Sequence, residues 1–221
     1  MNLRGITYTF CLSSATALLA GTVALAQQQM PSGQQPQQMP SQQPQPKMPS
    51  AGPGAYPGTA PTGQDFGERA FVSKAMEGDD SEVQLGQLAQ QKSQSDDVKQ
   101  LAQKLVSDHS QMNEKWLKPV AQQLGVSEPK GPSKKDKKAA AKLDGLSGSD
   151  FDAQYLTMMY KSHQQNLKEF QEEAKNAQNP NVKQIAEQGA NVISQHLQLI
   201  EQVAKNHNVD LNEMAKQSSS M

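Results

Sequence analysis

The sequence of 221 residues is poor in cysteine, in aromatic residues and in net charge. Its one cysteine, Cys11, excludes a framework of disulfide bonds. Aromatic residues make up 5% of the chain, which is low for a β-rich core, whereas the Gln, Ala, Lys and Leu of the second two-thirds favour helices. The formal net charge of -1 argues against a nucleic-acid binder, which carries a basic surface. The sequence also contains no glycine-rich phosphate-binding loop and no Cys-x-x-Cys-His haem motif.

Residues 1–26 have the features of a secretory signal peptide. Arg4 supplies the positive charge, residues 6–20 are mostly apolar, and residues 24–26 read Ala-Leu-Ala, a small-x-small cleavage site. The apolar run is too short for a comfortable transmembrane helix, although an uncleaved N-terminal anchor is the alternative. We therefore expect an exported protein, periplasmic or associated with the outer membrane, whose mature chain begins at Gln27 and contains no cysteine.

Three further segments follow the signal peptide. Residues 27–64 are rich in Gln, Pro, Met, Ser and Gly and carry one charge, Lys47, so they are expected to form a disordered linker, either a spacer or a passive tail. In residues 65–207 apolar side chains recur at helical spacing, which predicts the folded domain. Residues 208–221 end in Gln-Ser-Ser-Ser-Met and are predicted to be a flexible tail.

The folded domain is predicted to contain four long helices, each opened by a start signal. Two signals resemble capping boxes and two are single N-cap residues; in order they are Asp65/Glu68, Ser95, Ser149/Asp152, and Asn179 before Pro180. The octapeptide Ser-Asp-Asp-Val-Lys-Gln-Leu-Ala from residue 95 is repeated as Asn-Pro-Asn-Val-Lys-Gln-Ile-Ala from residue 179. Two short turns and one long crossover therefore predict an all-α, up-down-up-down four-helix bundle. Pro119 is expected to kink or fray the end of the second helix.

The crossover between the second and third helices, residues 126–149, is rich in lysine. Residues 133–143 are predicted to form a short surface helix within it. A run of positive charge is either solvated surface or a contact with an anionic envelope polymer or lipid headgroup. The residues concerned are Lys130, Lys134, Lys135, Lys137, Lys138 and Lys142.

One ionisable residue interrupts the apolar face of each predicted helix: Glu82, His109, His163 and His196. Glu82 and His109 lie 13 residues before and 14 after Ser95, so they share a height in the first hairpin. In the second hairpin the corresponding separations from Asn179 are 16 and 17 residues. The two pairs thus differ by three residues, about 4.5 Å along a helix. They form one layer if the hairpins are offset by a turn, and two stacked pairs if they are not.

A buried carboxylate or imidazole is costly unless it is paired or bound to a metal. One glutamate and three histidines have the chemistry to bind iron, zinc, manganese or copper. Asp79 and Asp108 are candidates to add an oxygen ligand or to orient a ring, and Met112 and Met159 would either suit copper or fill the core.

The alternative interpretation is a structural polar layer without metal. In that arrangement Glu82 pairs with His109 across the first hairpin, and His163 bonds to His196 or to Tyr155. No thiol nucleophile would exist in the mature chain, and no serine–histidine–acid set stands out.

Several segments together resemble a bacterial family of exported ferritin-like bundles, commonly labelled as domains of unknown function or outer-membrane proteins. Three of these segments are longer runs: Glu82-Val-Gln-Leu-Gly-Gln-Leu-Ala, Val98-Lys-Gln-Leu-Ala and Leu146-Ser-Gly-Ser-Asp-Phe-Asp152. The others are the pairs Asp108-His109 and His196-Leu and the single residues Tyr155 and His163. The resemblance covers about residues 66–205 and implies a ferritin-like four-helix fold and export, with no established activity. Val106 and Ile193 occupy the positions where the Glu-x-x-His motifs of di-iron ferritins carry glutamate, so that ligand set is incomplete.

From these features we expect an exported helical-bundle protein of the cell envelope, a binding or stress-related protein with a metal site, rather than an enzyme. One alternative is a metal-dependent redox enzyme that acts on peroxide or oxygen species through the same residues. The other is a structural or partner-binding module without metal, in which the polar residues only specify packing.

Overall fold

The computed structural model describes residues 63–213. The predicted signal peptide, the linker up to residue 62 and residues 214–221 of the predicted tail lie outside the described residues. Within residues 63–213 the chain is all-helical, with six α-helices, one π-helical segment and no strand. The α-helices are α1 (Gly63–Lys92), α2 (Asp96–Met112), α3 (Lys118–Leu124), α4 (Lys134–Asp144), α5 (Gly148–Asn176) and α6 (Pro180–Asn206).

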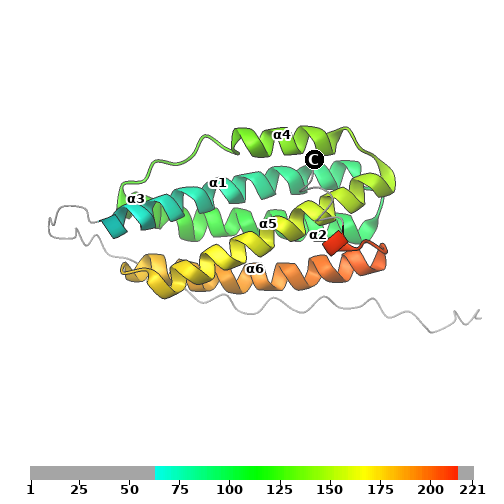
Figure 1. Ribbon diagram of the computed structural model, residues 1–221. Helices are drawn as coiled ribbons and strands as arrows, with labels where there is room; N and C mark the ends of the chain where they lie inside the picture. Colours follow the sequence, from blue (N-terminus) through cyan, green and yellow to red (C-terminus); the bar gives the residue numbers. More distant parts are fainter. Residues whose placement is uncertain (1–62, 214–221) are drawn as a thin grey trace, which may run out of the picture. The chain divides into compact units, whose positions relative to one another are not determined.

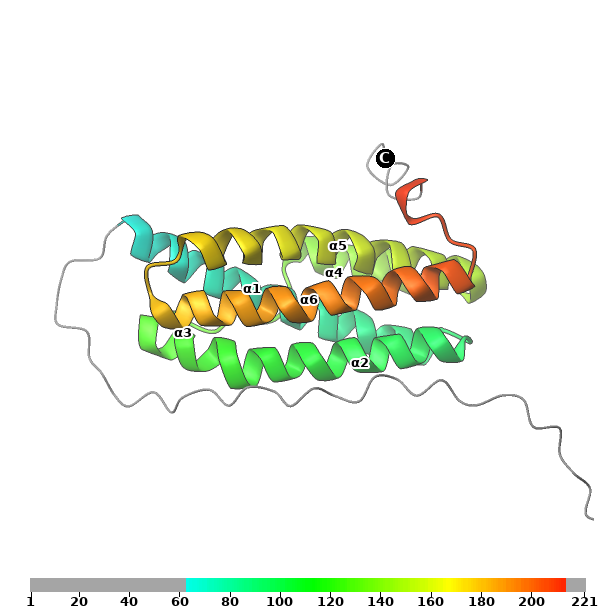
Figure 2. The same ribbon diagram turned by 90° about the horizontal axis from the view of Figure 1, so that it is seen from below.

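The long helices form two hairpins that pack into a helical bundle (Figures 1 and 2). The first hairpin consists of α1 and α2, the second of α5 and α6, and each is closed by a short turn. α3 continues the direction of α2, whereas α4 packs on the outside against α1 and α5 (Figure 1). None of the helices among the described residues is long and apolar enough to cross a membrane.

The first hairpin buries the apolar faces that the sequence predicts, including Leu85 on α1 and Leu101 on α2. Gly86 allows the two helices to approach closely, because a Cβ atom there would lie 2.6 Å from Val106 Cγ2 and 3.1 Å from the Ala102 carbonyl oxygen. Burial of these faces supplies most of the stability of such a hairpin, since helices in proteins are stabilised mainly by tertiary packing of their apolar faces.

The end of α2 is widened by a π-helical turn, Asn113–Leu117, directly before α3. Pro119 lies in the first turn of α3. Proline lacks an N–H group and its ring crowds the preceding turn, and an added residue in that turn relieves both problems. The predicted irregularity at Pro119 therefore takes the form of a π-helical turn, and the helix continues to Gly125, whose φ of 65° suits glycine.

The predicted surface helix of the crossover is α4, with boundaries within one residue of the prediction. Ser133 caps it by accepting a hydrogen bond of 3.1 Å from the Asp136 N–H. Ala140 and Leu143 face the bundle, and Ser81 of α1 donates a 3.0 Å hydrogen bond to the Asp136 carboxylate. The six lysines of the crossover are exposed to solvent.

Both predicted capping boxes are wrong, because tertiary contacts take their acids. α1 begins at Gly63, and Glu68 accepts hydrogen bonds of 2.6 and 3.0 Å from the backbone N–H groups of Gln178 and Asn179. α5 begins at Gly148, and Asp152 accepts a 2.9 Å hydrogen bond from the Ser95 hydroxyl. Each acid thus joins one hairpin to the turn of the other.

The single N-caps differ from each other. Asn179 caps α6 as predicted, accepting hydrogen bonds of 2.9 and 3.3 Å from the N–H groups of Asn181 and Val182. Ser95 stands at the N-cap position of α2, but its side chain makes no capping bond and contacts Asp152 instead.

The described part of the predicted tail, residues 208–213, is not free of the bundle. Leu211 is buried and belongs to the same core cluster as Ile200 and Ala204 of α6. The chain turns at Asn208, whose φ is 55°, and this turn brings Leu211 back to the core.

Candidate metal centre

The four ionisable residues from the apolar faces meet in one cluster, called here the His/Glu cluster: Glu82 of α1, His109 of α2, His163 of α5 and His196 of α6. Each is at most 3% exposed. His109 Nε2 lies 2.6 Å from Glu82 Oε2 and 3.4 Å from His163 Nε2, and His163 Nε2 lies 3.2 Å from His196 Nδ1. Of the two predicted arrangements, the structure therefore shows the single layer.

The other ring nitrogen of each histidine faces an oxygen acceptor. A carboxylate or carbonyl oxygen can only accept, so the nitrogen facing it donates. The remaining nitrogens of the neutral rings, His163 Nε2 and His196 Nδ1, then present their lone pairs to each other across 3.2 Å. His109 Nε2 instead faces Glu82 Oε2 at 2.6 Å and carries the proton of that ion pair in the metal-free protein. The donor–acceptor pairs are His109 Nδ1 with Asp79 Oδ1 at 2.8 Å, His163 Nδ1 with the Met159 carbonyl at 2.9 Å, and His196 Nε2 with Asp108 Oδ2 at 2.9 Å.

The spacing of the inward nitrogen atoms suits a metal ion. A tetrahedral site with metal–nitrogen bonds of about 2.0–2.1 Å places its ligand atoms about 3.3 Å apart. The separations of 3.4 Å between His109 and His163 and of 3.2 Å between His163 and His196 are close to that value. The Glu82–His109 separation of 2.6 Å is shorter, so the carboxylate would move outward by a few tenths of an ångström to share an ion.

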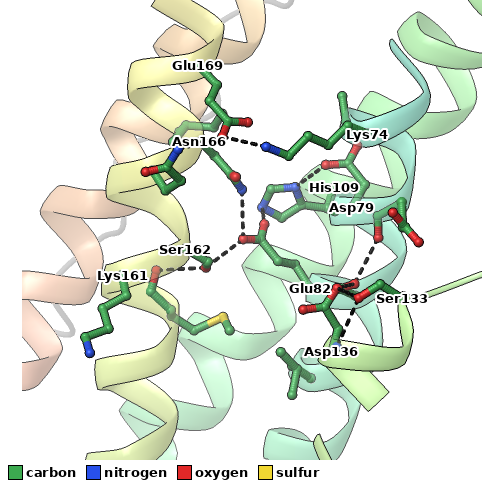
Figure 3. Close-up of a pocket in the computed structure, with 18 of the residues that line it drawn as sticks. Lys74, Asp79, Glu82, His109, Ser133, Asp136, Lys161, Ser162, Asn166 and Glu169 are labelled. Atoms are coloured by element: carbon green, nitrogen blue, oxygen red, sulfur yellow. Dashed lines mark hydrogen bonds and ion pairs between the residues drawn. The ribbon is translucent and has the colours of Figure 1, made fainter. Parts of the chain in front are cut away.

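Glu82 is held from α5 by two polar side chains that the sequence analysis did not identify. Ser162 Oγ donates a hydrogen bond of 2.9 Å to Glu82 Oε1, and Asn166 Nδ2 donates one of 3.3 Å to the same oxygen (Figure 3). The second oxygen, Oε2, is buried and forms the ion pair with His109 Nε2 at 2.6 Å. Ser162 adjoins His163 and lies four residues before Asn166. This spacing puts Ser162 and Asn166 on one face of the helix, and it was the sequence feature that could have identified them.

The charges of the cluster are unequal. Burial by itself would lower the pKa of His109, but the Glu82 and Asp79 carboxylates together raise it well above the ordinary value of 6.5. Burial lowers the pKa of His163, and it lowers the pKa of His196 to about 3 despite the hydrogen bond that His196 donates to Asp108. The Glu82 pKa is lowered because the two neighbouring imidazoles outweigh its burial. One cationic ring therefore faces one carboxylate, beside two neutral rings.

The two outer aspartates have different environments. Burial raises the pKa of Asp79 to about 6, against the lowering effect of His109. Asp108 lies nearer the surface, where His196 and Lys104 lower its pKa in spite of partial burial. Asp108 orients His196 on the other hairpin and not its neighbour His109, which the sequence order alone would not suggest.

The remaining candidates lie near the cluster without joining it. Tyr155 is buried, its hydroxyl has no hydrogen-bond partner, and burial raises its pKa. The bond from His163 to Tyr155 considered above is wrong, because His163 Nδ1 bonds to Met159 instead. Met159 acts through its carbonyl oxygen, and Met112 is buried in the core beside Gly189.

A cleft of about 510 Å³ leads to one side of the cluster, called here the Glu82 cleft. It lies between α1, α4 and α5, and its lining includes Glu82, His109 and Asp79 (Figure 3). His163 and His196 do not line it, so the cleft reaches the cluster at Glu82 and His109.

Comparison with known proteins identifies a family and a related fold. A family model described as "Domain of unknown function (DUF4142)" matches residues 54–203, more than half of the chain. No curated protein matches this sequence. A crystal structure of a DUF305 fragment from Deinococcus radiodurans is similar, with a TM-score of 0.57 and 18% sequence identity, and the match covers 66% of this chain and 97% of the fragment. At that identity the likeness shows a shared helical fold alone.

Proposed function

This chain belongs to the DUF4142 family of unknown function, and we propose that its His/Glu cluster binds one divalent transition-metal ion. His109, His163 and His196 would supply nitrogen ligands and Glu82 an oxygen ligand. Asp79 and Asp108 would hold two of the rings from outside, and Tyr155 would line the site without a bond. The chain would then act as a metal-binding, stress-related protein of the cell envelope.

The observation that carries this proposal is the orientation of the three rings. Metal-binding histidines almost always donate their second ring N–H to a carboxylate or carbonyl, and all three histidines of the cluster do so here. A structural polar layer would pair His109 with Glu82 and His163 with His196, and the first pair is a good ion pair. The second pair sets two lone pairs 3.2 Å apart, and lone pairs repel one another unless a cation lies between them. Metal binding would release the Nε2 proton of His109 and make that nitrogen the third ligand. Three imidazoles and one carboxylate accept iron, zinc, manganese or copper, and the ligands leave that choice open.

The origin of the four ligands on four different helices supports a ferritin-like, up-down-up-down four-helix arrangement as part of the proposal. Each ligand comes from a different long helix and projects inward, as metal ligands do in the cores of helical bundles. The absence of glutamate at Val106 and Ile193 distinguishes this ligand set from that of di-iron ferritins, so we propose one ion rather than two.

Export of the protein to the periplasm or the outer membrane is proposed from residues 1–26 alone. The mass of the chain recovered from a periplasmic fraction tests it. A chain that begins at Gln27 is expected, and a full-length chain in the cytoplasmic fraction would contradict export.

A second candidate function is a redox reaction of the bound metal with peroxide or an oxygen species. It is favoured by the Glu82 cleft, through which a small molecule can reach Glu82 and His109 from solvent. Metal-loaded protein would then consume hydrogen peroxide faster than metal-free protein, measured by peroxide electrode, whereas redox-silent zinc as the native ion would argue against it.

Metal content tests the main proposal directly. We expect protein purified without chelators, or reconstituted with each metal in turn, to contain one ion per chain by mass spectrometry. His109→Ala and His196→Ala should lose the ion. His207→Ala is the matched control, because this fourth histidine bonds to Asp97 and lies 11 residues, about 16 Å, beyond His196.

The control should keep the ion with the affinity of the wild type. A folded wild-type protein that takes up none of the four metals would overturn the proposal, and the cluster would then be a structural polar layer. Equal loss of metal in His207→Ala would show that binding depends on the fold in general and not on this cluster.

A further inference from the structure

The Glu82 cleft is larger than a bare ion needs. Six water molecules at about 30 Å³ each occupy about 180 Å³, so a divalent cation with its first hydration shell fits within a volume of about 510 Å³. The cleft leads from the surface to Glu82 and His109, whereas His163 and His196 are fully buried and do not line it. A cation that enters through the cleft would therefore meet Glu82 and His109 before His163 and His196.

The charges that line the cleft favour a cation. Five carboxylate residues contribute to the lining, compared with three lysines and the cationic His109, and the Lys74–Glu169 ion pair of 2.6 Å neutralises one charge of each sign (Figure 3). An excess of one sign in a recessed surface raises the local concentration of the opposite ion. The acidic residues are Glu77, Asp79, Glu82, Asp136 and Glu169.

One carboxylate oxygen at the inner end of the cleft, Asp79 Oδ2, is buried without a hydrogen-bond partner, and the Asp79 side chain is 6% exposed. The neighbouring Glu82 Oε2 forms the ion pair with His109 Nε2 at 2.6 Å. Asp79, Glu82 and His109 each place a ligand atom within 4.8 Å of the other two. A buried carboxylate oxygen without a partner is costly, and a cation that contacted Asp79 and Glu82 would remove that cost.

We infer that the Glu82 cleft is the entry route for a hydrated divalent cation, and that Asp79 and Glu82 are its first ligands before it passes to the histidines. This inference rests on the metal site proposed above. Each step replaces water by a protein oxygen or nitrogen, so the ion reaches the three rings without ever losing all of its ligands.

Gly78 allows the route to be obstructed without disturbing the site. It lies within α1 and lines the cleft, and a Cβ atom built there meets nothing within 4 Å. A Gly78→Phe side chain would therefore occupy the cleft and leave the His/Glu cluster untouched. Gly78→Ala controls for the change in helix propensity, and Gly67→Phe, at another open position of the same helix outside the cleft lining, controls for an added aromatic ring.

The experiment has two stages, both on the full chain. An equilibrium titration of metal-free protein with Co²⁺, followed by its visible absorption, first measures affinity in the wild type and in each variant. Stopped-flow mixing with Co²⁺ then gives the association rate, and mixing of the loaded protein with a chelator gives the dissociation rate. We expect Gly78→Phe to slow both rates at least tenfold with affinity unchanged within about threefold, because a route is not part of the bound state. The two controls should match the wild type.

Rates in Gly78→Phe equal to those of the wild type, at equal affinity, would overturn the entry route. Absence of Co²⁺ binding to the wild type would instead overturn the proposed metal site, and the first stage alone detects it. If Gly78→Phe does not fold, the salt dependence of the wild-type rate decides. Raising the ionic strength from about 0.01 to 0.15 M should slow association severalfold, since salt screens the acidic lining, and an unchanged rate would contradict the inference.

Discussion

The two hairpins of this protein share a sequence repeat but supply different chemistry to the His/Glu cluster. The first hairpin contributes Glu82, His109 and both outer aspartates, Asp79 and Asp108, so it carries three carboxylates and an imidazole of raised pKa. The second contributes His163 and His196, whose pKa values are lowered by burial. Glu82 and His109 of the first hairpin line the Glu82 cleft, whereas the two histidines of the second do not.

The sequence repeat accounts for the helices of both hairpins but not for the ionisable residues that they carry. The repeat places a helix start at residues 95 and 179 and matching apolar faces behind them. It does not dictate which ionisable residue interrupts each face. A first hairpin with carboxylates and a second hairpin with neutral imidazoles together suit a cation. The Glu82 carboxylate balances the charge of the ion, and the imidazoles of the second hairpin add ligands without adding charge.

The largest expected effect comes from removal of the charge on the first hairpin. Glu82→Gln leaves His109 without its closest anion, so we expect the metal-free protein to lose roughly 3–5 kcal/mol of unfolding free energy. His163→Gln, on the neutral hairpin, should cost only about 1–3 kcal/mol, because no ion pair is broken. Urea denaturation in the presence of a chelator measures both. Equal losses would show that the two hairpins are not electrostatically different.

Substitution of the outer aspartates should weaken metal binding in a graded way. Asp79→Asn removes a buried charge behind His109, and we expect an affinity lower by about 10–100-fold. Asp108→Asn acts on His196 from a position where the side chain is 20% exposed, so its effect should lie at the lower end of that range. Competition with a chromophoric chelator gives both constants. A larger loss for Asp108→Asn would show that the orientation of His196 matters more to metal binding than that of His109.

Close packing within each hairpin should respond similarly to an added methyl group. Gly189→Ala would force a Cβ atom onto the ring of Phe170, and Gly86→Ala would place one 2.6 Å from Val106 Cγ2. Each should cost about 1–3 kcal/mol in thermal or urea unfolding. Gly78→Ala, in open space, should instead stabilise α1 by about 0.5–1 kcal/mol. Destabilisation by all three variants would show that the space at Gly78 is not open.

The smallest expected effect concerns the contact between α2 and the end of α6. Asp97 is partly buried, which alone would raise its pKa, but its hydrogen bond with His207 lowers the pKa below the ordinary value of 3.8. The carboxylate therefore adds stability above pH 3.8 that is lost as the pH falls through the lowered value. Because the pair is partly exposed, Asp97→Asn should cost only about 0.2–1 kcal/mol near pH 6, and the cost should shrink as the pH falls below 3.8. Unfolding curves at several pH values test this, and a cost that grew as the pH fell would contradict it.

The sequence predicted the helical fold well where local signals agreed with burial. Asn179 before Pro180 marked the start of α6, and apolar periodicity identified the buried faces of α1, α2, α5 and α6. The prediction failed where a polar side chain had two possible hydrogen-bond partners, a helix end or a group on the other hairpin. Glu68 and Asp152 have the spacing of capping boxes, but both bond across the hairpins, because a tertiary partner can satisfy an acid as well as a helix end can.

The prediction of the candidate site likewise succeeded for some residues and failed for others. Counting from the caps identified Glu82, His109, His163 and His196, because one polar residue on an otherwise apolar face can be recognised from helical spacing alone. The count left one layer or two open, since the offset between hairpins depends on how their side chains interlock. Ser162 and Asn166 were missed because a polar residue at the edge of a buried face looks like ordinary surface until its partner on another helix is known.

The sequence by itself therefore determined the helices, their buried faces and the four residues that interrupt them, since all three follow from local periodicity. The tertiary structure alone decided the single layer, the partner of each ring nitrogen and the cleft beside Glu82. These depend on contacts between residues up to 88 positions apart, such as Asp108 with His196, whose distance is set by packing of the whole bundle.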